Sequence, residues 1–264
     1  MQFETSDSDF SKIPEGTTEL IYTGSSVGYY SNLPSTITTI TFRDAGVLKI
    51  NGIPNTVTQI NIKGCNKLRT LDRFPSKLET LIIGKCLILR SIGQLPDTLT
   101  HLEITDCEMI SRLTFRNPDF PHIFKKAPEF FLLPESITYL DVSGTSIENL
   151  VGVPKSVTHL MAKSCRNLKS IEGIPDTLFF LNCSGCQNLP SLKGLPDNLH
   201  TLICDHCVSL LLTRLPKGIK EFRASWVRAL PTLELQLLKR NLYYDTSLAS
   251  TIFRAKLLVV QGNL

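Results

Sequence analysis

Apolar and polar residues alternate in short stretches that recur along most of the chain. In one stretch Leu102 and Ile104 are apolar, while His101, Glu103 and Thr105 beside them are polar. Alternation with a period of two is typical of a β-strand that buries one face. The pattern returns every 20 or 21 residues over most of the chain, which predicts a series of short strands of similar length.

Prolines mark the boundaries of this repeat. Ten of the fifteen prolines lie 20 or 21 residues apart, except for one interval of 38 residues, which equals a unit of 21 plus 17 added residues. Proline suits a unit boundary because it fixes φ where no ladder N–H is required. The prolines are Pro14, Pro34, Pro54, Pro75, Pro96, Pro134, Pro154, Pro175, Pro196 and Pro216.

Positions within a unit are counted here from its proline. Apolar residues occupy positions three, six and eight, a small residue that is usually cysteine occupies position eleven, and leucine or isoleucine returns at fourteen and seventeen. A single strand of this kind cannot bury its apolar edge, whereas parallel strands stacked about 4.8 Å apart bury a continuous core. The remainder of each unit is short, so we expect an extended or 3₁₀ return segment there.

Written out, the unit reads LP-x-x-L-x-x-L-x-I-x-x-C-x-x-L-x-x-I, and it resembles the leucine-rich repeat signature. The resemblance covers roughly residues 14 to 229 and implies a leucine-rich repeat solenoid, a right-handed β-superhelix with about ten parallel strands on its concave face. We expect an N-terminal cap over residues 1–13, a solenoid over 14–229 with an insertion at 115–131, and a helical C-terminal cap over 230–264. A solenoid needs polar ends, and Pro231 suits the first turn of a cap helix.

Composition narrows the class of protein. The chain has 264 residues, is 42% hydrophobic and 20% charged, and carries a net charge of +4. It can therefore bury a core, and the small charge bias does not indicate nucleic-acid binding. No apolar run is long enough to cross a membrane, and the first fifteen residues do not resemble a secretory signal peptide. We expect a cytoplasmic protein that is monomeric.

The eight cysteines allow two chemical interpretations besides a structural one. Cys183-x-x-Cys186 and Cys204-x-x-Cys207 have the spacing of a zinc site. The repeat explains the same residues, because two of them fall at the inward position eight and the other two at position eleven. Disulfides between neighbouring units are compatible with the strand spacing, but the missing signal peptide favours a reduced environment. We favour buried free thiols and no bound metal or cofactor.

Two surfaces could bind a partner. Strand positions five and seven in the middle units place aromatic, methionine and charged side chains on an open face, and such residues are typical of protein interfaces. The added residues contain five of the thirteen phenylalanines, and a loop of this length is often functional. The phenylalanines could instead fold back over the gap between units. The candidates are His101, Glu103, Tyr139, Asp141, His159, Met161 and Phe180 on the concave face, and Phe120, Phe124, Lys125, Lys126 and Phe130 in the insertion.

Catalysis is disfavoured. His101 and His159 fall two strands apart, about 10 Å from one another, which is too far for one metal ion. The chain contains no nucleophile elbow, dinucleotide-binding, P-loop or zinc-protease motif. We therefore expect a non-enzymatic protein that binds another protein.

Segments such as Leu95-Pro-Asp-Thr-Leu99 and Leu195-Pro-Asp-Asn-Leu199 resemble the short repeats of leucine-rich effectors from intracellular bacterial pathogens. That resemblance implies translocation into a host cell without a classical signal peptide, and binding of a host protein through the repeats. Cysteine at position eleven is also similar to cytosolic plant resistance and F-box repeats. The alternative is therefore a cytosolic adaptor or receptor arm that acts in its own cell, and a hydrolase or metal-dependent enzyme is a third and weaker possibility.

Overall fold

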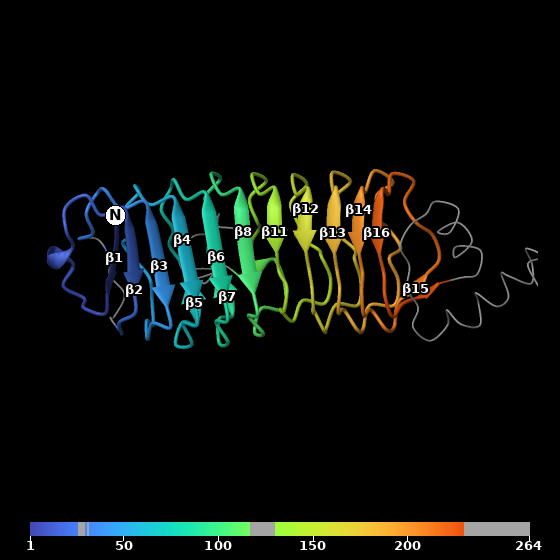
Figure 1. Ribbon diagram of the computed structural model, residues 1–264, viewed down its shortest axis with the longest axis horizontal. Coiled ribbons are helices and arrows are strands. Elements are labelled where there is room, and N and C mark those ends of the chain that lie inside the picture. Colours follow the sequence, from blue (N-terminus) through green and yellow to red (C-terminus); the bar gives the residue numbers. More distant parts are fainter. Residues whose placement is uncertain (26–29, 31, 117–129, 230–264) are drawn as a thin grey trace, which may run out of the picture.

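The computed structural model describes residues 1–25, 30, 32–116 and 130–229, and its strands stack into one long solenoid (Figure 1). Eleven strands form a single sheet in which all neighbours are parallel. They are β1 (Gln2–Thr5), β2 (Glu19–Tyr22), β3 (Thr39–Arg43), β4 (Gln59–Lys63), β6 (Thr80–Gly84), β8 (His101–Thr105), β11 (Tyr139–Asp141), β12 (His159–Met161), β13 (Phe180–Asn182), β14 (Thr201–Ile203) and β16 (Glu221–Arg223).

The units pair in the register that the sequence repeat predicts. Position-six residues lie side by side, as Leu81 does with Leu102 and Leu102 with Leu140. The pairing of Leu102 with Leu140 crosses the insertion, so the added residues do not shift the register. The predicted leucine-rich solenoid is confirmed by this arrangement.

Each unit enters its strand through a turn at its proline. The backbone N–H of position three donates to the proline carbonyl in all ten units, as from Leu99 to Pro96 at 3.1 Å and from Ile137 to Pro134 at 3.2 Å. Position ten ends the strand segment with a left-handed backbone in nine of the ten units, and Asp106 and Gly144 are examples, at φ of 52° and 71°. The turn at the proline fixes where each strand begins, and the left-handed residue fixes where the chain turns away from the sheet in nine units.

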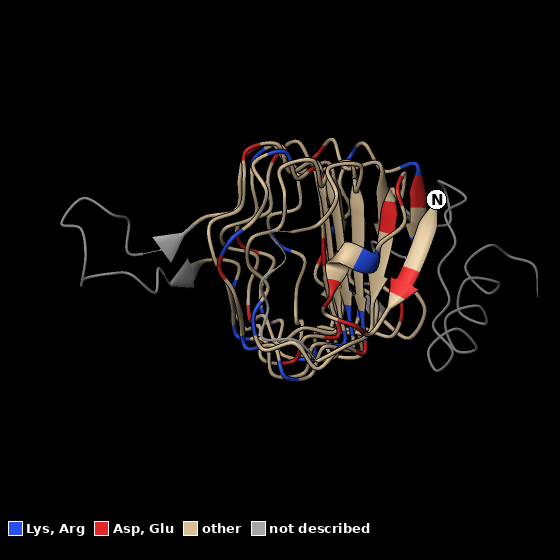
Figure 2. Ribbon diagram, turned by 90° about the vertical axis from the view of Figure 1, so that its left-hand side faces the viewer, with Lys and Arg blue, Asp and Glu red and all other residues tan. Residues whose placement is uncertain are grey.

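The return segments are mostly extended, as predicted. Two parallel pairs lie outside the main sheet, β5 (Thr70–Leu71) with β7 (Ser91–Ile92) and β15 (Leu211–Leu212) with β17 (Arg228–Ala229). One 3₁₀ turn, η1 (Phe10–Lys12), is the only helical element in the part of the chain that the structure describes. Seen along the solenoid axis, the units superimpose with the sheet on one side and the return segments on the other (Figure 2). No helix within the described ranges has the length and apolar character needed to cross a membrane.

The insertion leaves and re-enters the solenoid as a two-stranded antiparallel ribbon, β9 (Phe115–Arg116) with β10 (Phe130–Phe131). Strand β9 lies next to β7, so the ribbon is attached to the return side of the solenoid and not to the main sheet. Residues 117–129, which include Phe120, Phe124, Lys125 and Lys126, lie outside the described residues, as does the side chain of Phe130.

The core is one continuous column of buried apolar side chains between the sheet and the return segments. At its N-terminal end Tyr22, Tyr30 and Phe42 pack ring against ring with Phe10. The N-terminal segment adds β1 to the sheet, which is why the sheet has eleven strands where about ten were expected. The helical cap predicted for 230–264 lies outside the described residues.

Candidate protein-binding face

The outward side chains of the main sheet form what we call the sheet face, and its middle units carry two aromatic pairs. Tyr139 lies between His101 and His159 in the strand register, and Phe180 follows His159. The rings of His101 and Tyr139 are parallel within 2° with centroids 4.3 Å apart, and those of His159 and Phe180 are 5.9 Å apart. All four are wholly or partly exposed, so the structure brings the predicted aromatic residues together in one row.

The row of aromatic rings includes two residues that the sequence did not predict. Phe179 is 44% exposed, and its ring centroid lies 4.5 Å from that of His200 and 6.1 Å from that of His159. Both Phe179 and His200 occupy position four, which is threonine in six of the ten units. The replacement of threonine by an aromatic ring in these two consecutive units was the signal that could have identified them.

Two predicted acidic residues next to this row differ in their surroundings. Glu103 accepts a hydrogen bond from, or forms an ion pair with, the Nε2 atom of His101 at 2.8 Å. This contact orients the His101 ring against Tyr139. Asp141, by contrast, is nearly buried in the sheet face, and only 9% of the residue is exposed.

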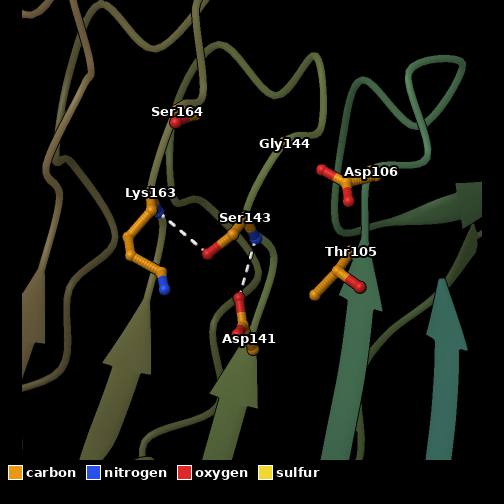
Figure 3. A pocket seen from close by; sticks show the side chains of 7 residues that line it. All are labelled: Thr105, Asp106, Asp141, Ser143, Gly144, Lys163 and Ser164. Carbon is orange, nitrogen blue, oxygen red and sulfur yellow. Dashed lines mark hydrogen bonds between the residues drawn. The ribbon is translucent and has the colours of Figure 1, made fainter. Parts of the chain in front are cut away.

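Asp141 lies at the base of a hollow of about 330 Å³ (Figure 3). Strand β8 and the turn after it form one wall, and the turns that follow β11 and β12 form the rest. The backbone N–H of Ser143 donates to Oδ1 of Asp141 at 2.8 Å, and the N–H of Lys163 donates to Oγ of Ser143 at 3.0 Å. The lining residues are Thr105, Asp106, Asp141, Ser143, Gly144, Lys163 and Ser164.

Gly144 allows two of the turns that line this hollow to lie close together. Its backbone is left-handed, and a Cβ atom built there would collide with the carboxylate of Asp106. Glycine therefore permits the two turns to approach each other.

Burial alters the acidity of two groups on this part of the face. Loss of solvent raises the pKa of Asp141 above its usual value, and Glu103 nearby raises it further, while hydrogen bonds from Ser143 and the positive charge of Lys163 partly offset the change. Loss of solvent also raises the pKa of the Tyr139 hydroxyl, with the carboxylates of Asp141 and Glu103 acting in the same direction. The carboxylates are thus close enough to influence one another and the ring between them.

Met161 and His159 are the remaining candidate residues on the sheet face. Met161 is half-buried in β12 and pairs in register with Asp141 on one side and Asn182 on the other. His159 is the most exposed of the predicted set, and its Nδ1 atom lies 2.9 Å from the hydroxyl of Thr158. Aromatic, thioether and acidic groups therefore lie side by side across four strands.

Cysteines at position eleven form hydrogen bonds that link neighbouring units. Cys186 donates to the carbonyl of Ala162 at 3.0 Å and Cys207 to that of Cys183 at 3.1 Å, each reaching back to the preceding unit. Thr145 makes a related bond to Val142 at 2.6 Å where position eleven lacks cysteine. All eight thiols are free and buried, and no group of three potential metal ligands forms among the described residues.

Known protein structures share this architecture, whereas comparisons of the sequence found no match. No protein-family model and no curated protein matches the chain. YopM from Yersinia enterocolitica WA-314 is similar over 81% of this chain and 47% of its own, with 20% identity and a TM-score of 0.50. CroV588, described as a novel circular leucine-rich repeat protein, is similar over 83% of this chain and 35% of its own, with 18% identity and a TM-score of 0.51.

This chain has the leucine-rich repeat fold. It spans about half the length of the matched YopM chain and about a third of CroV588. A YopM structure from Yersinia pestis, described as a leucine-rich effector protein, is also similar, with 19% identity and a TM-score of 0.41. The parallel strands of this chain form one continuous sheet surface.

Proposed function

We propose that this chain is a non-enzymatic protein-interaction module that binds a partner protein through the middle of its sheet face. The row of exposed aromatic rings that runs from His101 to Phe180, beside Met161 and two carboxylates, is the observation that carries the proposal. Aromatic and methionine side chains are enriched at the centres of protein interfaces. The acidic groups in the same patch oppose a nucleic-acid partner, because they would repel phosphates.

The finer proposal is that the chain is a translocated bacterial effector and that the partner is a host protein. The repeat unit resembles those of leucine-rich effectors, and the fold is similar to that of YopM. Eight free buried thiols suit a reducing cytosol. A reporter fusion that measures delivery into host cells would separate this role from that of a cytosolic adaptor acting in its own cell.

The binding site is tested by replacing Tyr139, His159 and Phe180 together with alanine. We expect capture of the partner from host lysate, quantified by mass spectrometry, to fall at least tenfold, because the aromatic contact area is lost. The melting temperature should change little, since these side chains lie outside the core. Alanine at Thr39, Gln59 and Thr80, which occupy the same position five in earlier strands, is the matched control and should leave capture unchanged.

Full capture by the triple variant would remove the sheet face from the proposal. The insertion would then be the candidate, and Phe120, Phe124, Lys125, Lys126 and Phe130 would be the next residues to replace.

A further inference from the structure

Two aspartates on the sheet face have nearly equal burial but different partners. Asp205 is 7% exposed and Asp141 is 9% exposed. Asp205 accepts hydrogen bonds from the N–H and hydroxyl of Ser225, both at 2.7 Å, and its other oxygen pairs with Nε of Arg223 at 2.8 Å. A nearly buried carboxylate is thus neutralised by an arginine from the same chain.

Asp141 has no such arginine. Within the described residues its hydrogen-bond partner is Ser143 alone, and no basic group lies within ion-pair distance of it. Lys163 lines the same hollow and its positive charge lowers the pKa of Asp141, but its ammonium group is not within ion-pair distance of the carboxylate. A carboxylate withdrawn from water is costly unless a positive group and hydrogen bonds compensate it.

The surroundings of Asp141 suit a planar cation. Asp106 contributes a second carboxylate to the wall of the hollow, and Thr105, Ser143 and Ser164 contribute hydroxyl groups. Tyr139 precedes Asp141 by two residues on β11, but its ring does not line the hollow and is stacked on that of His101. A guanidinium group pairs with a carboxylate through a planar fork of N–H donors and has further donors for nearby hydroxyl groups, whereas an ammonium group lacks this fork.

We propose that the hollow receives an arginine side chain of the partner protein, whose guanidinium group pairs with Asp141 and donates to the hydroxyl groups around it. This inference rests on the proposed function, because the arginine belongs to a segment that docks on the sheet face. The pairing of Arg223 with Asp205 is the intramolecular counterpart of the contact. Metal binding is the weaker alternative, since no cluster of three ligands forms among the described residues.

The probe for a direct test is N-acetyl-arginine methylamide, added to the full chain, with the citrulline and lysine analogues as comparisons. The amide of Ser143 donates to Asp141 and therefore reports on the carboxylate in NMR spectra. We expect a saturable shift of this amide with the arginine probe and none with citrulline, which has nearly the same shape but no charge. Equal shifts with citrulline or lysine, a shift caused by Mg²⁺ or Ca²⁺ alone, or no saturable shift would each overturn the proposal.

The variant that isolates the charge is Asp141→Asn. Asn182 occupies the same position seven in β13 and accepts a hydrogen bond from the N–H of Ser184 at 3.1 Å, so asparagine preserves the turn. We expect Asp141→Asn to remain folded, to lose the saturable shift and to capture at least tenfold less partner. Asp205→Asn is the control and should keep both, because Asp205 already has its arginine.

The two proposals fail in different ways. Capture that is lost in the triple alanine variant but unchanged in Asp141→Asn would overturn the arginine contact and leave the sheet face as the binding site. Capture that is unchanged in both variants would overturn the sheet face itself, and the arginine contact with it.

Discussion

The solenoid has two halves whose strands differ in length. Strands β3, β4, β6 and β8 before the insertion have five residues each, whereas β11, β12, β13, β14 and β16 after it have three each. Figure 1 shows the change as a step between β8 and β11. Both halves share the same period and the same inward position six, so the difference has a local cause.

Position eight also differs between the halves. In the first half it is aromatic or isoleucine, and these residues favour the extended backbone of a strand. In the second half it is valine, alanine or cysteine, and the strands end at position seven, two residues earlier than β3, β4, β6 and β8. The residues are Tyr22, Phe42, Ile62, Ile83 and Ile104, followed by Val142, Ala162, Cys183, Cys204 and Ala224.

Two asparagines at position seven show the effect of this environment. Asn61 in β4 precedes Ile62, and its side-chain amide donates along the sheet face to the hydroxyl of Thr41 at 3.1 Å. Asn182 in β13 precedes Cys183, and its side-chain oxygen instead accepts from a backbone N–H two residues later. A short polar side chain competes with the ladder for backbone groups only where the strand is free to end.

The hollow that is lined by Asp141 and Ser143 lies at the junction of the two halves of the solenoid, between β8 and β11. Strand β8 continues to Thr105, while β11 ends at Asp141, so neighbouring strands stop at different levels. The candidate arginine site is therefore a product of the difference between the halves.

The largest expected effect on stability concerns position six, a core position that both halves of the solenoid share. Leu81 and Leu140 are both fully buried at position six. We expect Leu81→Ala and Leu140→Ala each to lower the free energy of unfolding by about 2–5 kcal/mol, because each leaves a cavity in the core. Urea titration would measure this, and an unchanged unfolding midpoint for Leu140→Ala would show that this side chain does not point inward.

An intermediate effect tests what distinguishes the halves. Ala162→Ile places a first-half residue in the second half, and we expect a loss of about 1–3 kcal/mol, because the core there is already filled. Ile83→Val, the opposite change, should cost about 0.5–1.5 kcal/mol. Similar stability of Ala162→Ile and the unaltered chain would mean that position eight does not determine the packing of the second half.

The smallest effect concerns the cysteines. Burial raises the pKa of Cys65 from its usual 9.0 to about 12. The unfolded chain therefore releases this proton near pH 9, before the folded chain does, and stability falls between pH 9 and 12. Linkage gives a loss of about 1.4 kcal/mol at pH 10 from this thiol. Cys65→Ala should lose correspondingly less stability between pH 8 and 10, and an identical pH dependence would contradict the assigned burial.

The sequence predicted the features that repeat, and missed those that depend on differences between units. Ten units in phase determine which positions point inward, so the register of Tyr139 with His101 and His159 follows from the spacing. The burial of Asp141 could not be predicted, because it depends on where β11 ends relative to β8. Phe179 and His200 were missed because position four lies before the strand, where an outward aromatic row was not expected.

The ribbon of β9 and β10 has a practical consequence for protein engineering. The chain accommodates 17 added residues at this point, and Leu102 still pairs with Leu140 as neighbouring units do elsewhere. Because the ribbon is attached on the return side, a fluorescent label or an affinity peptide grafted there would leave the sheet face open. The natural insertion thus marks a position where foreign sequence can be carried without disturbing the stack.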